Sequence, residues 1–168
     1  MTVSALEVAK YLLSLDPKRE YFTLNWMKPK SNWESTPLEG SFRLNKMLHI
    51  CQMLHCAKYK QPLFSEHLLA FEHGGVVEVV RTSFVEFFNT LEEKKFNLSD
   101  ITKNLIQKTF AYFRQQDNEV LENFSHDDPA WKLGKEQGDI QAMPLNEELI
   151  NYYADFLDDV LEEVFVSK

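Results

Sequence analysis

Residues 44–64 read LNKMLHICQMLHCAKYKQPLF, and this stretch decides the fold. At about 100° per residue on a helix, most of the circumference is apolar. One broad side carries Leu44, Met47, Leu48, Cys51, Leu54 and His55, and the opposite side carries Ile50, Met53 and Ala57. Because a helix that is apolar almost all round is usually buried, we expect this to be the central helix of the domain. It should end near Lys60 and Gln61, ahead of Pro62.

What remains polar on this helix is a narrow line, called here the polar line, of Asn45, His49, Gln52, Cys56 and Tyr59. These residues recur every three or four positions and therefore share one side of a helix. Such a line is either a set of internally satisfied hydrogen bonds or the wall of a binding groove.

Two patterns precede the central helix. Ser4 and Glu7 have the spacing of a capping box and predict a first helix that ends before Pro17. Residues 18–41 have no regular pattern and are predicted to form a connecting segment, in which 23–27 (TLNWM) could form a short strand. Trp26 and Trp33 in this segment either fold back over the core or offer a contact surface, and packing is favoured because indole rings bury large areas.

The segment that follows the central helix, residues 63–80, reads LFSEHLLAFEHGGVVEVV. It predicts a short structured passage, a turn at Gly74 and Gly75, and a helix from about Val76 to Thr90. Four later helix starts are indicated by capping or helix-forming residues: Ser99, a short helix around 119–124, Asp128 with Pro129 in the first turn, and Asn146. The helix after Pro129 should end at Gly134 or Gly138, and the helix after Asn146 should be a single one that packs lengthwise on the core.

Composition limits the fold class. The 168 residues suit one domain of ordinary size, and a 44% hydrophobic content provides a core. Few glycines and prolines argue against an all-β chain with many tight turns. We therefore expect a mainly α, single compact domain over residues 1–168 around a buried central helix, to which a short strand or hairpin could be added.

Charge and hydropathy exclude several classes of partner. A net charge of −8 would repel a phosphate backbone, so nucleic acid is a poor candidate. The loose basic cluster of Lys94, Lys95, Lys103 and Lys108 is better interpreted as a solvated helix face. The N-terminus has no signal-peptide pattern, and no run approaches the roughly 20 apolar residues that span a bilayer. We expect a cytoplasmic protein without membrane association.

A catalytic or metal site is not favoured by the pattern. Cys51 and Cys56 should be free thiols on a buried helix, where a thiol is normally inert. Cys51 and His55 have ligand spacing but lie on the most apolar face, so we expect His55 to be a hydrogen-bonded core histidine. A metal site would require folding to bring in His67, His73 or His126. We therefore predict no metal, no cofactor and no enzymatic activity, with a metal-dependent enzyme kept as the least favoured alternative.

Residues 44–64 also resemble the signature of the Panacea family, the phage-associated SocA-like proteins. The matching positions of this signature are Lys46, Leu48, Gln52, His55, Ala57, Tyr59, Pro62, Leu63 and Phe64. Two further family elements resemble residues 70–77 and 126–131, with matches at Ala70, Phe71, Gly74, Val76, Val77, His126, Pro129 and Trp131. The opening LEVAKYLL and the closing NEELINYY also look like family elements. Gly75 stands where the family has a proline, and His49 and Ile50 stand where it has an aromatic pair. Residues 18–41 are longer than the family's usual connection, so the resemblance implies a longer connecting insertion there.

The resemblance implies a mainly helical antitoxin of a toxin–antitoxin system, encoded in a bacterial or prophage genome, that neutralises a cognate toxin by direct protein binding. The implied contact surface is the glycine turn with its neighbours Glu72, His73, Gly74, Gly75, Val76, Val77 and Glu78. The motif residues Lys46, Gln52, His55, Tyr59, His126 and Trp131 would have either a structural or a contact role. The alternative is a prophage protein that binds a host factor or acts as a proteolytic adaptor.

Overall fold

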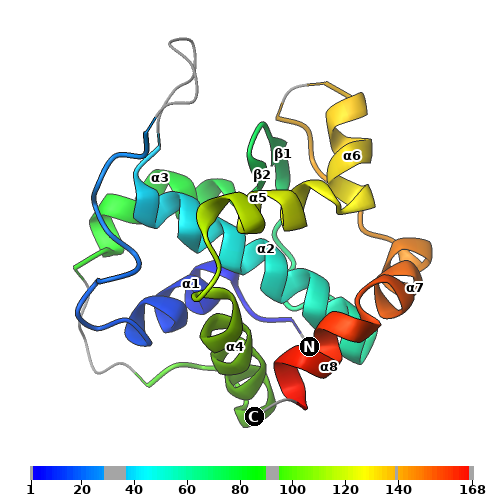
Figure 1. The fold of residues 1–168 in the computed structure, drawn as a ribbon, viewed down its shortest axis with the longest axis horizontal. Helices are drawn as coiled ribbons and strands as arrows, with labels where there is room; N and C mark the ends of the chain where they lie inside the picture. The colour runs from blue at the N-terminus through cyan, green and yellow to red at the C-terminus, as the bar shows by residue number, and fades with distance from the viewer. Residues whose placement is uncertain (1, 29–36, 90–94, 139, 167–168) are drawn as a thin grey trace.

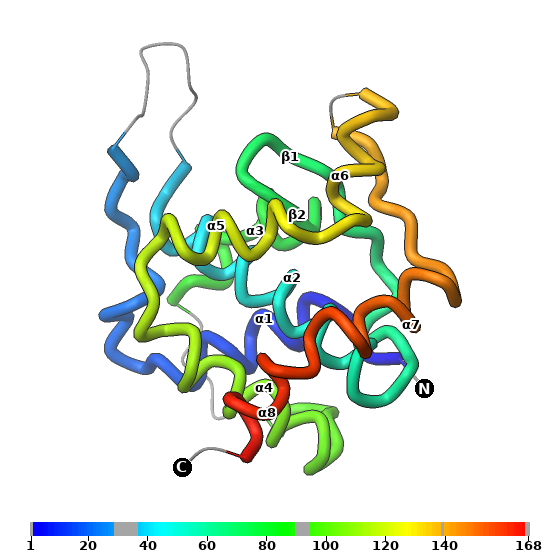
Figure 2. The backbone as a smooth tube through the Cα atoms, turned by 45° about the vertical axis from the view of Figure 1, so that its right-hand side comes forward, coloured from blue at the N-terminus to red at the C-terminus, as the bar shows by residue number. Residues whose placement is uncertain are grey.

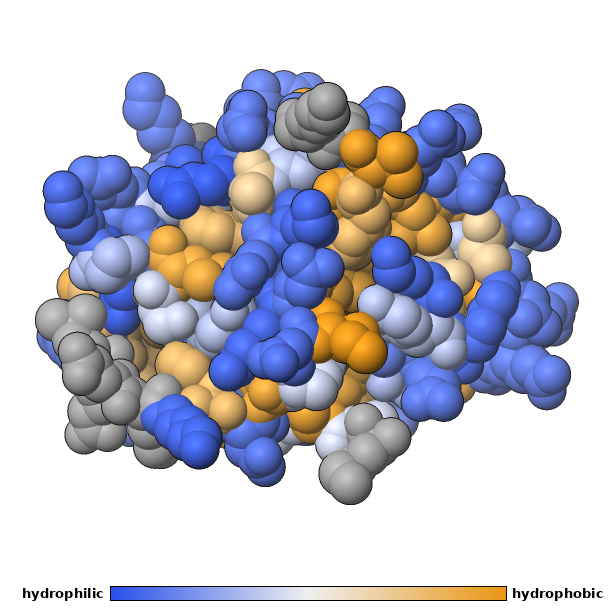
Figure 3. All heavy atoms as spheres, turned by 90° about the horizontal axis from the view of Figure 1, so that it is seen from below, coloured by the Kyte–Doolittle hydropathy of each residue, from blue (hydrophilic) through white to orange (hydrophobic). Residues whose placement is uncertain are grey.

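The computed structural model describes residues 2–28, 37–89, 95–138 and 140–166. Over these ranges the chain forms eight helices and one two-stranded antiparallel hairpin, which confirms the predicted mainly α fold. None of the helices in the described ranges combines the length and the apolar character needed to cross a bilayer. The hairpin and α6 lie at one end of the molecule, and α4 and α8 lie at the other (Figures 1 and 2). Seen from that second end, the surface is largely hydrophilic around separate apolar patches (Figure 3).

The predicted central helix is α2 (Glu39–Tyr59), which runs diagonally through the middle of the molecule (Figure 1). It contacts α1, α3, α4, α5, α7, α8 and the second hairpin strand. Its apolar residues on both sides are fully buried, among them Leu44, Leu48, Ile50 and Leu54. The helix ends where Lys60 adopts a left-handed conformation with φ 60° and ψ 25°. It begins earlier than the pattern indicates, so the end of the 18–41 segment is already helical.

The first helix, α1 (Ala5–Ser14), begins as predicted, with the Ser4 side chain accepting a hydrogen bond from the Glu7 N–H. The Glu7 carboxylate, however, accepts from the distant Asn97 N–H at 3.0 Å. Beyond the helix, the buried Asp16 carboxylate accepts from the N–H groups of Glu20, Tyr21 and Phe22. These bonds fix the start of the 18–41 segment against the core.

The prediction of a strand at 23–27 is wrong, because Trp26 forms only an isolated bridge with Leu38. The expected packing over the core is also wrong for Trp26, whose side chain is 71% exposed. Trp33 lies outside the described residues. The backbone on both sides of Trp26 is bonded to the start of α2 and the residues before it, because the Met27 N–H donates to the Pro37 carbonyl and the Asn25 carbonyl accepts from the Glu39 N–H.

The hairpin pairs β1 (Leu69–Phe71) with β2 (Gly74–Val76), with Phe71 opposite Gly74. The predicted turn at the two glycines is therefore wrong: the turn is Glu72–His73, and the glycines belong to the second strand. Gly74 has φ +131°, and a Cβ there would stand 2.6 Å from Lys46 Nζ. A Cβ on Gly75 would stand 2.8 Å from His49 Nδ1. The glycines thus let the strand run directly against α2.

The next helix, α3 (Glu78–Phe87), starts later than predicted, because Val76 pairs in the hairpin and Val77 is the N-cap residue. The helices α4 (Asp100–Phe113) and α5 (Asn118–His126) follow as predicted, the first capped by Ser99. α6 (Pro129–Glu136) is capped by Asp128 and carries Gly134 in its interior; Gly138, with φ +131°, lies beyond its end.

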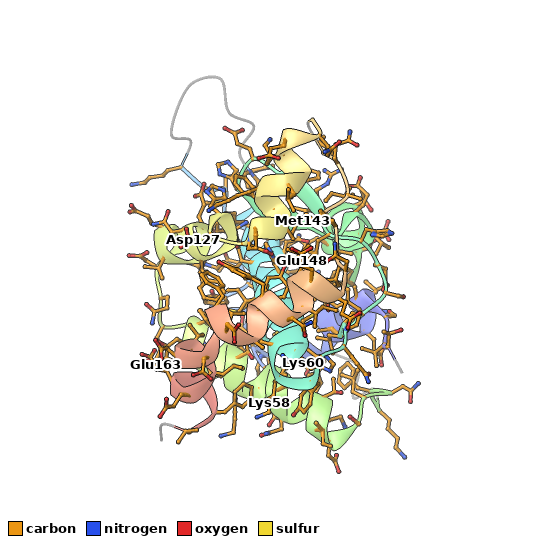
Figure 4. The ribbon with its side chains drawn as sticks, turned by 90° about the vertical axis from the view of Figure 1, so that its right-hand side faces the viewer. Lys58, Lys60, Asp127, Met143, Glu148 and Glu163 are labelled. Carbon is orange, nitrogen blue, oxygen red and sulfur yellow. The ribbon has the colours of Figure 1, made fainter. Side chains whose placement is uncertain are left out.

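The predicted single last helix is in fact two helices, α7 (Glu147–Phe156) and α8 (Asp158–Phe165). Leu157 separates them with φ −105° and ψ 11° and is itself buried. Figure 4 shows α7, marked by Glu148, crossing the end of α2 at Lys60. The chain then turns so that α8 also packs on α4. One straight helix could not follow both neighbours, although its apolar pattern continues through the break.

Candidate functional site

A groove of about 900 Å³ lies beside the hairpin and is called here the hairpin groove. It lies between the start of α2, the hairpin, α3 and the region around the end of α6. Phe42, Phe71 and Phe84 contribute apolar walls, and Trp26, Val85 and Ile140 line it as exposed apolar residues. Polar or charged lining comes from Ser41, Asn45, Lys46, Glu72, His73, Arg81 and Lys135.

Three of the apolar residues that line the hairpin groove are more than half exposed to solvent. Trp26 is 71% exposed, Val85 64% and Ile140 54%. They come from three segments far apart in the sequence and gather around a single groove. Clustered exposed apolar surface next to a concave site is typical of a protein-binding surface.

Lys46 lies at the bottom of this groove and is 1% exposed. Its Nζ lies 4.6 Å from the centre of the Phe42 ring. Within the described ranges, the contacts that act on this ammonium are the Phe42 ring face and the charge of Glu122. Burial lowers the pKa of Lys46 to about 7, and the charge of Glu122 opposes this shift. The side chain is therefore a cation that the protein itself solvates poorly.

The hairpin turn is held by side chains of α5 and α6. His126 Nε2 lies 2.8 Å from the Glu72 carbonyl oxygen, and Trp131 Nε1 donates to the Phe71 carbonyl at 2.7 Å. The two rings stack on each other at 4.1 Å. The pKa of His126 is lowered, mainly by burial; the bond to the Glu72 carbonyl opposes this shift. The sequence did not distinguish a structural from a contact role for the motif residues His126 and Trp131. In the structure both side chains support the backbone of the turn.

His73 at the turn is also tied down, because its Nδ1 lies 2.9 Å from Glu122 Oε1. Of the predicted contact residues, Gly74, Gly75 and Val77 are buried, while Glu72 and Glu78 are exposed and His73 and Val76 are half-buried. The accessible part of the predicted surface is therefore formed by Glu72, His73, Val76 and Glu78. Three of these four, all except Glu78, line the hairpin groove.

The polar line of α2 contains satisfied internal hydrogen bonds. Asn45 Oδ1 accepts from the Val77 N–H at 3.0 Å. Gln52 Oε1 accepts from the N–H groups of Leu63 and Phe64, and its Nε2 donates to the Phe64 carbonyl. Asn45 also lines the hairpin groove, so both interpretations of the line hold for this residue.

The last turn of α2 carries two further motif residues. His55 Nδ1 lies 2.6 Å from the Gln61 carbonyl oxygen, so the predicted hydrogen bond is present. The prediction of a core position is wrong, because His55 is only half-buried. Its ring packs against the half-buried Tyr59 ring at 5.0 Å. Burial lowers the pKa of His55. This pair stabilises the chain reversal after the helix and lies outside the hairpin groove.

His49 is the residue that sequence reasoning undervalued. It is fully buried; its Nε2 lies 2.7 Å from Asp128 Oδ2, and its Nδ1 accepts from the Gly75 N–H at 3.2 Å. Because Nδ1 accepts, the ring proton sits on Nε2 and is donated to the Asp128 carboxylate. The other oxygen, Asp128 Oδ1, accepts from the Tyr153 hydroxyl at 2.6 Å and from the Ala130 N–H at 2.9 Å.

Two departures from the family signature thus contact each other, since His49 accepts from Gly75. A proline at position 75 would have no N–H to donate. The sequence shows that this chain departs from the family at both positions. It does not indicate that the two residues contact each other, because they lie 26 positions apart.

His49, Asp128 and Tyr153 also line a second, smaller cavity of about 290 Å³. Both ring nitrogens of His49 are engaged, so the ring has no lone pair for a proton from a substrate. Burial and the Asp128 charge raise the pKa of Tyr153, which keeps its hydroxyl a donor. This cluster is arranged to join α2, α6 and α7 rather than to perform acid–base chemistry.

The thiols and histidines form no evident metal centre. Cys51 and Cys56 are buried free thiols, and burial raises the pKa of each to about 12. No group of three or more His, Cys, Asp or Glu side chains in the described ranges could hold a metal ion. Of the three histidines that a metal site would need, His67 is exposed, His73 is bound to Glu122 of α5, and His126 is bound to the Glu72 carbonyl.

Comparison with known proteins gives one match. The family model of SocA-like antitoxins with a Panacea domain matches residues 44–132, more than half of the chain. This range runs from Leu44 in α2 through the hairpin to the first turn of α6, and it includes all three internal motifs. The opening and closing segments that look like family elements lie outside it. Neither a curated protein nor a solved structure matches the chain. The chain belongs to the antitoxin SocA-like, Panacea-domain family.

Proposed function

We propose that this protein is an antitoxin-like binding protein that neutralises a cognate toxin by direct contact at the hairpin groove. Family membership supports a role as an antitoxin-like protein with a protein partner. The observation that carries the choice of surface is the gathering of Trp26, Val85 and Ile140, all more than half exposed, around one groove. Apolar side chains in such an arrangement bury area only when a partner covers them.

The predicted contact residues fit this proposal in part. Glu72, His73 and Val76 line the groove, and Glu78 lies at the adjacent start of α3. The turn that carries them is held from behind by α5 and α6, so it presents a preformed surface that costs little entropy to bind. A net charge of −8 would speed association with a basic toxin, because opposite net charges steer diffusional encounter.

The test is co-expression with the product of the adjacent gene, scored by growth and by co-purification. Wild-type protein should restore growth and form a complex. Val85→Glu, in the groove, should weaken both. Val120→Glu should leave both unchanged, because Val120 is also an exposed helical valine, at 41%, but does not line the groove. Equal behaviour of the two variants would remove the groove from the proposal.

Absence of both rescue and complex would remove the proposed toxin partner. The same experiment with a panel of host proteins would then address a host-factor or adaptor role. Both ring nitrogens of His49 are engaged, and this argues against an enzyme built on the most polar buried cluster.

A further inference from the structure

We propose that the hairpin groove recognises a carboxylate of the partner protein, carried on a segment with apolar neighbours and bound by the ammonium group of Lys46. This inference rests on the proposed function for the identity of the partner but not for the chemistry of the site. It defines what enters the groove: an Asp or Glu side chain, or a terminal carboxylate, flanked by aliphatic or aromatic residues.

The first argument is the state of Lys46. Lys46 is only 1% exposed, and it lines the groove. Within the described ranges, its neighbours of opposite character are the Phe42 ring face at 4.6 Å and the charge of Glu122. A buried ammonium normally has a hydrogen-bonded anionic partner, because desolvation without one is costly. A carboxylate in the groove would supply this partner.

The second argument is that neighbouring charges are already committed. Arg81 Nη2 donates to Glu78 Oε1 at 2.7 Å, and its guanidinium lies over the Phe71 ring. Asn45 accepts from the Val77 N–H and donates to the Ser41 carbonyl, and His73 is bound to Glu122. Among the three cations that line the groove, Lys46, Arg81 and Lys135, only Lys46 is fully buried. Its charge is therefore the one that water solvates least.

The third argument separates a carboxylate from a phosphate. A phosphate group carries more charge and is usually met by several donors or a helix N-terminus. Of the cations that line this groove, only Lys46 is fully buried, since Lys135 is half-buried and Arg81 is exposed, and the Glu72 carboxylate also lines the groove. A carboxylate, with one negative charge, therefore fits this environment better than a phosphate with two. The Lys46 ammonium can donate up to three hydrogen bonds to it.

The fourth argument concerns what lies beside the charge. Phe42, Phe71 and Phe84 line the groove, and Trp26, Val85 and Ile140 are exposed along it. A volume of about 900 Å³ can take several side chains. A segment that places apolar side chains against these walls and one carboxylate at Lys46 would satisfy both parts of the groove, whereas a free small anion would leave the apolar part uncovered.

The first experiment measures affinity for the adjacent-gene product by calorimetry. Lys46→Met keeps the length of the side chain and removes the charge, and we expect it to weaken binding by about 10- to 100-fold, the loss typical of one buried charged hydrogen bond. Lys58→Met is the matched control on the same helix, because Lys58 is exposed and outside the groove. Unchanged affinity of Lys46→Met would overturn the inference and leave the toxin-binding proposal intact.

The second experiment needs no partner. Wild-type protein with ¹³C-labelled lysines is titrated with the capped peptides Ac-Phe-Glu-Leu-NH₂ and Ac-Phe-Gln-Leu-NH₂ and with sodium phosphate, and the Lys46 Cε signal is identified by its loss in Lys46→Met. We expect the Glu peptide alone to shift this signal. Equal shifts with both peptides, a shift with phosphate alone, or no shift with the Glu peptide would each overturn the inference. A Glu-specific shift without any toxin complex would support the inference while removing the proposed function.

Discussion

Lys46 keeps a titratable ammonium group inside the protein, and its pKa makes a prediction about stability. Burial lowers the pKa of this group in the folded state to about 7, against an ordinary value of 10.5 for a lysine in water. Below pH 7 Lys46 is charged in both the folded and the unfolded protein, and folding bears the full cost of desolvating this charge. Between about pH 7 and 10.5 the unfolded state binds more protons than the folded state, so the stability contributed at this site rises with pH.

We therefore expect Lys46→Met to be more stable than wild type at pH 6 and to lose this advantage as the pH rises toward 10, at most by about 1.4 kcal/mol per pH unit. Urea unfolding of both proteins across this range measures the difference. Glu122, His73 and His126 lie near Lys46 and are present in both proteins, so their contributions largely cancel in the difference. A difference that does not change with pH would contradict the assigned pKa.

Tyr153 gives a second prediction for a single residue. Its hydroxyl donates to Asp128 Oδ1 at 2.6 Å, and both side chains are buried. Tyr153→Phe removes one of the bonds that solvate a buried carboxylate and should lower the free energy of unfolding by about 1–3 kcal/mol. The neighbouring Tyr152→Phe is the control, since Tyr152 is 48% exposed and should change stability by less than about 0.5 kcal/mol. Chemical denaturation that gives equal losses for the two would contradict the role of the Asp128 cluster.

At the scale of the element, the hairpin depends on how closely β2 approaches α2 and α5. Gly74 and Gly138 share φ +131°, so an alanine is strained at both positions. Only at Gly74 would the new Cβ meet close neighbours, with Lys46 Nζ at 2.6 Å and Ser125 Cβ at 2.9 Å, against 3.7 Å or more at Gly138. Gly74→Ala should therefore destabilise the fold more than Gly138→Ala, by about 1–3 kcal/mol, as is typical of overpacking.

Urea unfolding measures this difference, and amide hydrogen exchange of Leu69 and Val76 shows whether the hairpin opens first. Similar losses for the two variants would mean that backbone conformation alone explains the glycine at 74, and that the strand can move away from Lys46.

Elements with a strong local signal could be predicted from sequence. α2 was predictable because apolar residues cover most of its circumference, and α1, α4 and α7 because Ser4, Ser99 and Asn146 accept the expected capping bonds. The hairpin was not placed correctly because its strands have three residues each, too few for an alternating pattern, and a Gly-Gly pair is typical of a turn. The break at Leu157 was missed because packing on two different neighbours, not the local pattern, causes it.

The candidate site could be predicted only in part, for the same reason. The polar line drew attention to Asn45, His49 and Gln52, but their partners lie up to 79 residues away in the chain. The exposure of Trp26 was contrary to the usual behaviour of indole rings. The hairpin groove depends on bringing Trp26, Val85 and Ile140 together, and no spacing along the chain indicates this.

At the scale of the whole molecule, charge acts in two ways on the same partner. The net charge of −8 attracts a basic surface over a long distance, whereas the Lys46 ammonium in the groove would take up a single carboxylate at contact. A toxin that is basic overall but inserts one acidic residue would satisfy both. Association rates should then fall with added salt more than the lifetime of the complex does, because screening acts on exposed charges more than on buried ones.

The arrangement of the other helices around α2 predicts that the chain unfolds as a single unit. Helices α1, α3, α4, α5, α7 and α8 all contact α2, so few local regions can open without exposing its apolar surface. Leu54 lies in α2 and is fully buried; Leu54→Ala should lower the free energy of unfolding by about 2–5 kcal/mol. Leu133→Ala, at a position 41% exposed on α6, should change it much less. In both variants tryptophan fluorescence and far-ultraviolet circular dichroism should give coincident transitions in urea; separate transitions would show that the hairpin end unfolds independently of the α4 and α8 end.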